Sequence, residues 1–338
     1  MSAQTGVAGG RRGVALNDGT RKRIEILVLS LPALIMFLGF VILPVFMAAY
    51  YGFFQWKGYG KPNVNGKFIG LANYGMILTD PNFQEALAHT LFVVVASLVI
   101  QGPLAILFAL LLNQKFKGRA LIRTLIFVPY VVSEVIVGTG WSLILQSTGA
   151  LNAVLSKLGL PGVDWISDPK VAIWTLMFII SWKYIGFAVI LMIAGMQSIP
   201  EELYEAAMVD GAGFWRRQWS ITLPLLGPTI RIWAFMSIIG SLQLFDLVYI
   251  IWGQYVSSTA GTSTMATYMV REGRLANNYG YGSAVAVVIF VISLVIALAY
   301  QKFVLNRDLD GAITDKKDAE RRARREAKQA AKAKGVAR

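Results

Sequence analysis

Long apolar stretches separated by short polar connections dominate the sequence. A helix needs about 20 apolar residues to cross a bilayer. Stretches of that kind lie near Ile26–Phe53, Ala86–Asn113, Leu121–Leu145, Val171–Met196, Thr229–Ile251 and Ser283–Leu305. Hydrocarbon cannot hydrogen-bond an exposed backbone, so helices are expected rather than open strands. The pattern predicts an all-α integral membrane protein with about six transmembrane helices.

The basic residues fall in particular connections. The chain has 32 Lys and Arg against 19 Asp and Glu. The cations gather before the first stretch, between the second and third, between the fourth and fifth, and after the last. The positive-inside rule then predicts that both chain termini lie in the cytoplasm. We expect three parts: a basic N-terminal segment (1–25), a membrane domain (26–305) and a basic tail (306–338).

Composition excludes several function classes. Only 15% of residues are charged, against about 25% in soluble domains. The chain has no Cys and a single His, and no G-x-x-x-x-G-K-[ST] phosphate loop occurs. We therefore predict no catalytic residue, cofactor site or metal ligand on this chain. The tail lacks interleaved aromatics, which favours attraction to anionic membrane lipid over nucleic-acid binding.

The connection between the fourth and fifth stretches is unusually polar and reads IPEELYEAAMVDGAGFWRRQWSITLPLL, residues 199–226. Two acids suit the positive end of a helix dipole, and Leu203, Ala206 and Ala207 repeat at helical spacing. The Asp210-Gly211 pair is expected to end this helix, because glycine accepts a left-handed cap. Small residues with acids at the rim would suit docking of a soluble protein. A helix lying on the membrane surface fits the periodicity equally well.

A family resemblance rests on the same residues. The string EAAMVDGA-x₈-ITLP, from Glu205 to Pro224, resembles the EAA loop of ABC-importer membrane subunits. Further strings, including FIGLANYGMIL and GRALIRTLIFVPYVVSEVIVGTGW, look like the sugar-type branch of these permeases. The resemblance covers about Leu31 to Leu305. It implies the fold of a type I ABC-importer permease in a bacterial cell membrane.

The resemblance also implies partners and roles. The loop at 199–226 would be a coupling helix seated in a cytoplasmic ABC ATPase subunit, which would hold ATP and Mg. A second homologous permease chain and an extracellular or periplasmic sugar-binding protein would complete a carbohydrate importer. The expected coupling residues are Glu201, Glu202, Glu205, Ala206, Ala207, Asp210 and Gly211.

Charged and polar groups at membrane depth are the candidates for a substrate pathway, because they are costly unless they face a cavity or a partner. The candidates are Glu134, Lys183, Gln243, Asp246 and Tyr249. Gln243 and Asp246 are expected on one helix face, three residues apart. Alternatively, Lys183 pairs with Glu134 or Asp246 as a tie between helices, or its side chain extends to the membrane interface.

Two other functions are alternatives to the importer. An ion-coupled secondary transporter would need ligands for its coupling ion and often carries an internal repeat, and no convincing repeat is seen. A membrane-embedded enzyme would need a cluster of reactive groups, whereas the charged candidates are spread over three spans.

Overall fold

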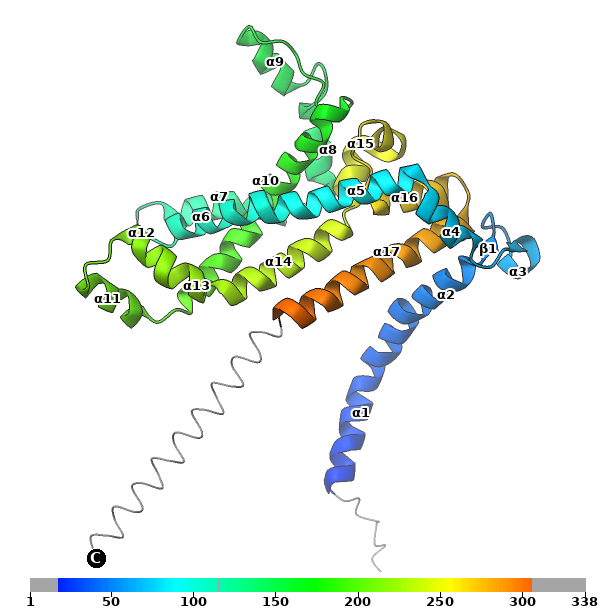
Figure 1. Ribbon diagram of the computed structural model, residues 1–338, viewed down its shortest axis with the longest axis horizontal. Helices are drawn as coiled ribbons and strands as arrows, with labels where there is room; N and C mark the ends of the chain where they lie inside the picture. Colours follow the sequence, from blue (N-terminus) through cyan, green and yellow to red (C-terminus); the bar gives the residue numbers. More distant parts are fainter. Residues whose placement is uncertain (1–17, 115, 306–338) are drawn as a thin grey trace, which may run out of the picture. The chain divides into compact units, whose positions relative to one another are not determined.

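The computed structural model describes residues 18–114 and 116–305 (Figure 1). The basic tail, 306–338, and most of the basic N-terminal segment, 1–25, lie outside the described residues. The chain divides into two compact units, the first of which ends at Tyr50. This first unit carries α1 (Asp18–Phe37), the π-helix η1 (Leu38–Ile42) and most of α2 (Leu43–Tyr51). They form one continuous apolar helix in which Glu25–Tyr51 is long enough to cross a membrane.

The second unit begins with two short strands and two short helices. Strands β1 (Phe54–Gln55) and β2 (Lys67–Phe68) pair antiparallel around α3 (Pro62–Asn65), and α4 (Ala72–Thr79) follows. The next span is made of α5 (Pro81–Ala96), η2 (Ser97–Gln101) and α6 (Gly102–Leu112). Asp80 caps α5 by accepting the backbone N–H of Asn82.

The third predicted span is broken. The sequence suggests one helix near Leu121–Leu145, but the structure has α7 (Arg119–Val131) and α8 (Glu134–Ile144) bent by 96°. Pro129 lies in the last turn of α7, where it removes a backbone donor. Ser133 then caps α8 by accepting the N–H of Ile136. The proline and the new cap together give a local reason for the bend.

The remaining spans follow in order. They are α10 (Pro169–Gln197) after the short α9 (Ala150–Lys157), then α14 (Gly227–Leu242) with α15 (Asp246–Thr259), and α17 (Tyr279–Tyr300) with η5 (Gln301–Leu305). Helix α16 (Met265–Val270) and η4 (Arg271–Leu275) connect the last two. Within the described residues, five helices are long and apolar enough to span, or six with the bent pair. The prediction of about six transmembrane helices is confirmed.

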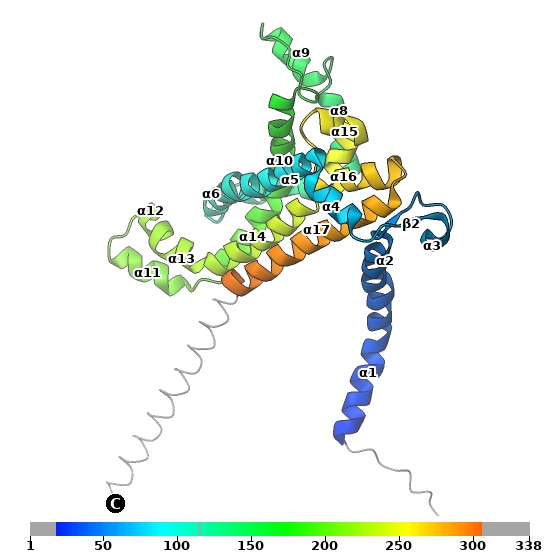
Figure 2. The same ribbon diagram turned by 45° about the vertical axis from the view of Figure 1, so that its right-hand side comes forward.

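Helix α10 is the centre of the second unit. It packs against α6 and α7. It contributes to two buried apolar clusters: one also includes residues of α8 and α15, and the other includes residues of α6 and α14. At Gly186 a Cβ would lie 2.2 Å from the carbonyl oxygen of Ile126, so α10 touches the backbone of α7 there. Figures 1 and 2 show α14 and α17 side by side. The segment α11–α13 lies at one end of α14 and the β1–β2 pair lies near the opposite end of this unit (Figure 1).

Candidate functional site

The polar connection forms a helical hairpin whose first arm is α11 (Glu201–Val209). Gly211 adopts a φ of +75°. Its N–H bonds to the carbonyl of Met208 at 3.0 Å, and the N–H of Ala212 bonds to that of Ala207 at 2.8 Å. These are the two bonds of a Schellman cap. A Cβ on Gly211 would meet nothing within 4 Å, so backbone conformation alone favours glycine.

The second arm of the hairpin comprises α12 (Phe214–Arg217), the π-helix η3 (Gln218–Thr222) and α13 (Leu223–Leu225). One hydrogen-bond chain joins the two arms. The hydroxyl of Tyr204 lies 3.0 Å from Oγ1 of Thr222, which donates to Oε1 of Gln218 at 2.7 Å. Thr222 is buried, so this chain fixes α11 against the second arm.

The two faces of α11 differ in their surroundings. Glu201 and Glu205 line a hollow of about 710 Å³ that also includes Arg119 and Arg217. Nothing in the sequence pattern connects these two arginines with the acids. The side away from the hollow is open: Ala206 is exposed, and Val209, one turn after Glu205, is 89% exposed.

The seven expected coupling residues are therefore spread around the helix. Glu202 and Asp210 are exposed, as is Gly211 at the cap, whereas Ala207 is half-buried. A partner protein could contact the open face of α11 directly, and Glu201 and Glu205, which are also exposed, border the hollow at the edge of that face.

A second cavity lies among α5, η2, α10 and α14. Its volume is about 220 Å³, and its polar lining comes from Ser97, Gln101, Tyr130, Tyr184, Ser237 and Ser241. Ser97 donates to Oε1 of Gln101 at 2.7 Å and lies 2.7 Å from Oγ of Ser237. The pathway candidates predicted from the sequence were other charged and polar groups at membrane depth and did not include these serines. Serine residues within an otherwise apolar span are the sequence feature that could have indicated this cavity.

Lys183 and Glu134 form a tie at the break of the third span. The Lys183 side chain is 2% exposed, and its Nζ donates to the carbonyls of Val132 and Pro129 at 2.6 and 3.3 Å. Nζ also lies 3.4 Å from Oε1 of Glu134, which accepts the Tyr184 hydroxyl at 2.7 Å. Neither of the two charged residues lines the 220 Å³ cavity. The geometry matches the alternative considered above, a tie between helices.

The other three candidates lie around the break between α14 and α15. Gln243 is the C-cap residue of α14, and Asp246 begins α15. The expectation that they share one helix face is therefore wrong, because the helix breaks between them. Asp246 and Tyr249 do lie three apart on α15, where Tyr249 stacks on Phe245 at 5.0 Å. None of the three residues lines the 220 Å³ cavity.

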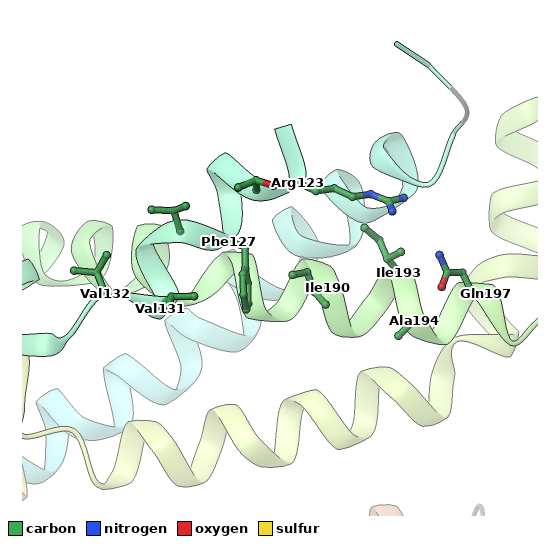
Figure 3. Close-up of a pocket in the computed structure, with 10 residues that line it drawn as sticks. Arg123, Phe127, Val131, Val132, Ile190, Ile193, Ala194 and Gln197 are labelled. Carbon is green, nitrogen blue, oxygen red and sulfur yellow. The ribbon is translucent and has the colours of Figure 1, made fainter. Parts of the chain in front are cut away.

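A third hollow runs along α7 and α10 and has a volume of about 650 Å³. Figure 3 shows Arg123 extended toward the end where Gln197 lies, with Phe127, Ile190 and Ile193 along the wall. Nη2 of Arg123 donates to the carbonyl of Leu112 at 2.6 Å. The walls are mainly apolar, so this groove offers few partners to a hydroxyl-rich solute. The 220 Å³ cavity is better suited to a hydroxyl-rich solute, because serine and glutamine side chains line it.

The sequence is similar to those of named transport proteins. The family model described as "Binding-protein-dependent transport system inner membrane component" matches residues 101–309. The trehalose/maltose transport system permease protein MalF of Thermococcus litoralis is 32% identical over 278 residues, which is 81% of this chain and 92% of that protein. The sulfoquinovosyl glycerol transport system permease protein SmoG of Agrobacterium fabrum is 33% identical over 290 residues, which is 85% and 92% of the two chains.

A solved structure has the same architecture. A chain of a bacterial alginate ABC transporter, in complex with an alginate pentasaccharide-bound periplasmic protein, is 28% identical with a TM-score of 0.74. The match covers 85% of this chain and 96% of that one. The relatives are named as permease subunits of transport systems, not as enzymes. With more than half of its length matched by the family model, this chain belongs to the family of binding-protein-dependent transport system inner membrane components.

Proposed function

We propose that this chain is a permease subunit of an ATP-driven carbohydrate importer in a bacterial cell membrane. The observation that carries the proposal is the hairpin: the EAA-type residues lie on a short capped helix with one open face, in a chain of this transport family. The names of the relatives support a sugar as cargo, since they include a trehalose/maltose and an arabinooligosaccharide transport permease.

The hairpin is the proposed contact with the energy source. A cytoplasmic ABC ATPase subunit, which binds ATP and Mg, receives α11 in a cleft. The open face of α11, with Ala206 and Val209, supplies close contact. Glu205 supplies charge at the edge of that contact. The distribution of cations supports an arrangement with the hairpin and both chain termini on the cytoplasmic side.

The remaining partners follow from the proposed transport cycle. An extracellular sugar-binding protein delivers its cargo to the end of the spans opposite the hairpin. A second homologous permease chain forms the translocation path with this one. Within this chain, the cavity containing Gln101 and Ser237 is the first candidate for sugar contact, because it offers amide and hydroxyl groups in an apolar setting. Glu134, Lys183, Gln243, Asp246 and Tyr249 remain candidates for the shared path.

Copurification tests the proposal. The tagged chain is extracted from its native membrane in mild detergent, and the retained proteins are identified. We expect an ABC ATPase and a second permease, and the reassembled complex should take up sugar in vesicles only with ATP and the binding protein. Uptake driven by an ion gradient in the absence of the ATPase would instead support a secondary transporter.

A further inference from the structure

A polar hollow lies at the end of the helices opposite the hairpin. Its volume is about 530 Å³, and its lining includes Gln55, Trp56, Asp80, Glu272, Asn278 and Tyr281. These residues come from β1, the start of α5, η4 and the start of α17, which meet at this end of the second unit (Figure 1). The hollow is separate from the 220 Å³ cavity that Ser97, Ser237 and Ser241 line, called the serine-lined cavity below. The two share no lining residue.

Asp80 supplies a fixed negative charge to this hollow. Its Oδ2 accepts the hydroxyls of Tyr268 and Tyr281 at 2.5 and 3.2 Å, and its Oδ1 accepts the backbone N–H and side-chain amide of Asn82 at 2.8 and 3.2 Å. Burial raises the pKa of Asp80, but these hydrogen bonds outweigh it and hold the pKa below its ordinary value. Four donors occupy the carboxylate, so it acts on a ligand through its charge rather than by a new hydrogen bond.

Other groups around the hollow retain bonding capacity. Oε1 of Glu272 accepts Nε of Arg271 at 3.1 Å, and a carboxylate has a second oxygen to offer. Gln55 and Asn278 are exposed amides, each of which can both donate and accept. The indole N–H of Trp56 is directed to the carbonyl of Tyr59 at 3.1 Å, so the ring contributes an apolar surface. Planar polar groups beside an aromatic ring suit the hydroxyls and C–H faces of a sugar.

We propose that this hollow is a subsite for neutral oligosaccharides, distinct from the serine-lined cavity. The volume falls in the range of small-ligand sites, about 300–1,000 Å³. The charge of Asp80 disfavours an acidic sugar, because like charges repel strongly where solvent is partly excluded, whereas the charge of Glu272 is offset by Arg271. The inference rests on the proposed carbohydrate transport and adds to it a place and a charge preference. A sugar held here waits at the entrance before it passes between the helices.

Direct binding tests the subsite. The purified complex in lipid nanodiscs, without binding protein or ATP, is titrated with maltotriose and with trehalose, and binding is followed by saturation-transfer NMR. We expect at least one of these neutral sugars to bind. Gln55→Ala and Asn278→Ala should each weaken that binding about threefold to tenfold, the usual effect of losing one hydrogen bond. Both residues are exposed, so the variants should fold normally.

Three comparisons make the test specific. Asn63→Ala, an exposed asparagine on α3 outside the hollow, is the matched control and should leave binding unchanged. An alginate oligosaccharide, which is acidic, should not compete. Gln101→Ala should leave this binding intact, because it alters the other cavity. Absence of binding to both neutral sugars, or binding that only Gln101→Ala weakens, would overturn the subsite.

The subsite and the proposed function can fail separately. ATP-dependent uptake by the wild-type complex with its binding protein reports on the proposed function alone. Normal uptake without sugar binding at the hollow overturns only the subsite. Sugar binding at the hollow by a complex that never transports a sugar leaves a binding site in place but refutes the importer.

Discussion

The ammonium of Lys183 donates to the carbonyl of Val132 over 2.6 Å and thereby joins the middle of α10 to the break of the third span. A bend of 96° leaves carbonyls at the end of α7 without helical partners. Such groups are costly in a bilayer unless another group satisfies them. A cation near a helix C-terminus also interacts favourably with the negative end of the helix dipole. Lys183 therefore stabilises the bent conformation.

Replacing Lys183 with Met should strongly destabilise the protein. The change would leave the carboxylate of Glu134 and the carbonyl of Val132 without the cation. Breaking a fully buried ion pair costs about 3–5 kcal/mol, which is an upper bound here because the Glu134 side chain is 27% exposed. We expect a clear drop in the unfolding temperature in detergent. The double variant Lys183→Met with Glu134→Gln should recover part of the loss, because it removes the unpaired charge. An unchanged unfolding temperature in the single variant would contradict the tie.

Substitution of Gly211 tests the hairpin cap. Alanine fits the open space at this position, but a left-handed conformation costs a residue with a Cβ about 1–2 kcal/mol. Gly211→Ala should therefore reduce the sugar transported per ATP hydrolysed, with the spans still inserted. Gly213→Ala is the matched control, since Gly213 has a φ of −66° and equally open surroundings. Equal coupling ratios in the two variants would rule out a role for the cap.

Reversing the charge of Glu205 should weaken the association with the ATPase. Glu205→Lys removes the proposed partner of an ATPase cation and adds a third cation to the hollow that contains Arg119 and Arg217. We expect the yield of copurified ATPase to fall at least tenfold, which corresponds to about 1.4 kcal/mol. Glu85→Lys, on an exposed side chain of α5, is the charge-matched control. Full retention of the ATPase by the Glu205 variant would exclude a charge contact there.

Two serine-to-alanine variants test whether the serine-lined cavity contacts the sugar. Ser237→Ala removes a hydroxyl that lies 2.7 Å from Ser97 in the cavity. We expect the KM for sugar uptake to rise about threefold or more, since one hydrogen bond is worth about 1 kcal/mol. Ser293→Ala should have no such effect, because the buried Oγ of Ser293 has no hydrogen-bond partner. An unchanged KM in Ser237→Ala would move the sugar path away from this cavity.

Asp80 should make stability depend on acid pH. Hydrogen bonds lower its pKa in the folded protein despite burial, so the folded state holds the charged form more readily than the unfolded state. Its stabilising contribution is present above the unfolded pKa, which is about 4, and is lost as pH falls through the folded value. The difference in unfolding temperature between wild type and Asp80→Asn should be largest near neutral pH and shrink below about pH 4. A difference that is constant with pH would indicate an effect unrelated to this charge.

Local patterns in the sequence predicted some of these features well. Apolar length located the spans, and Asp210-Gly211 located the end of α11, because both depend on neighbouring residues. The break at Pro129 was harder to recognise, since proline is tolerated in many membrane helices. Gln243 was misplaced because an apolar window does not reveal where α14 ends.

The cavities could not be predicted in the same way. Ser97 and Ser237 are 140 residues apart in the sequence, and only packing of α14 against η2 brings them together. Likewise, Lys183 could be expected to pair with Glu134 or with Asp246. The bend of the third span selects Glu134 by bringing the start of α8 to α10.

The contact of Gly186 with the backbone of Ile126 has a mechanical consequence. The two helices pack closely along their length as well as at this point, so α7 and α10 should move as one rigid lever. Helix α10 has 29 residues, about 43 Å at 1.5 Å per residue, and only Ser198, Ile199 and Pro200 separate it from α11. A push on α11 is thus carried across the membrane thickness by a paired arm, and the contacts of Glu134 with Lys183 and Tyr184 link the start of α8 to that arm.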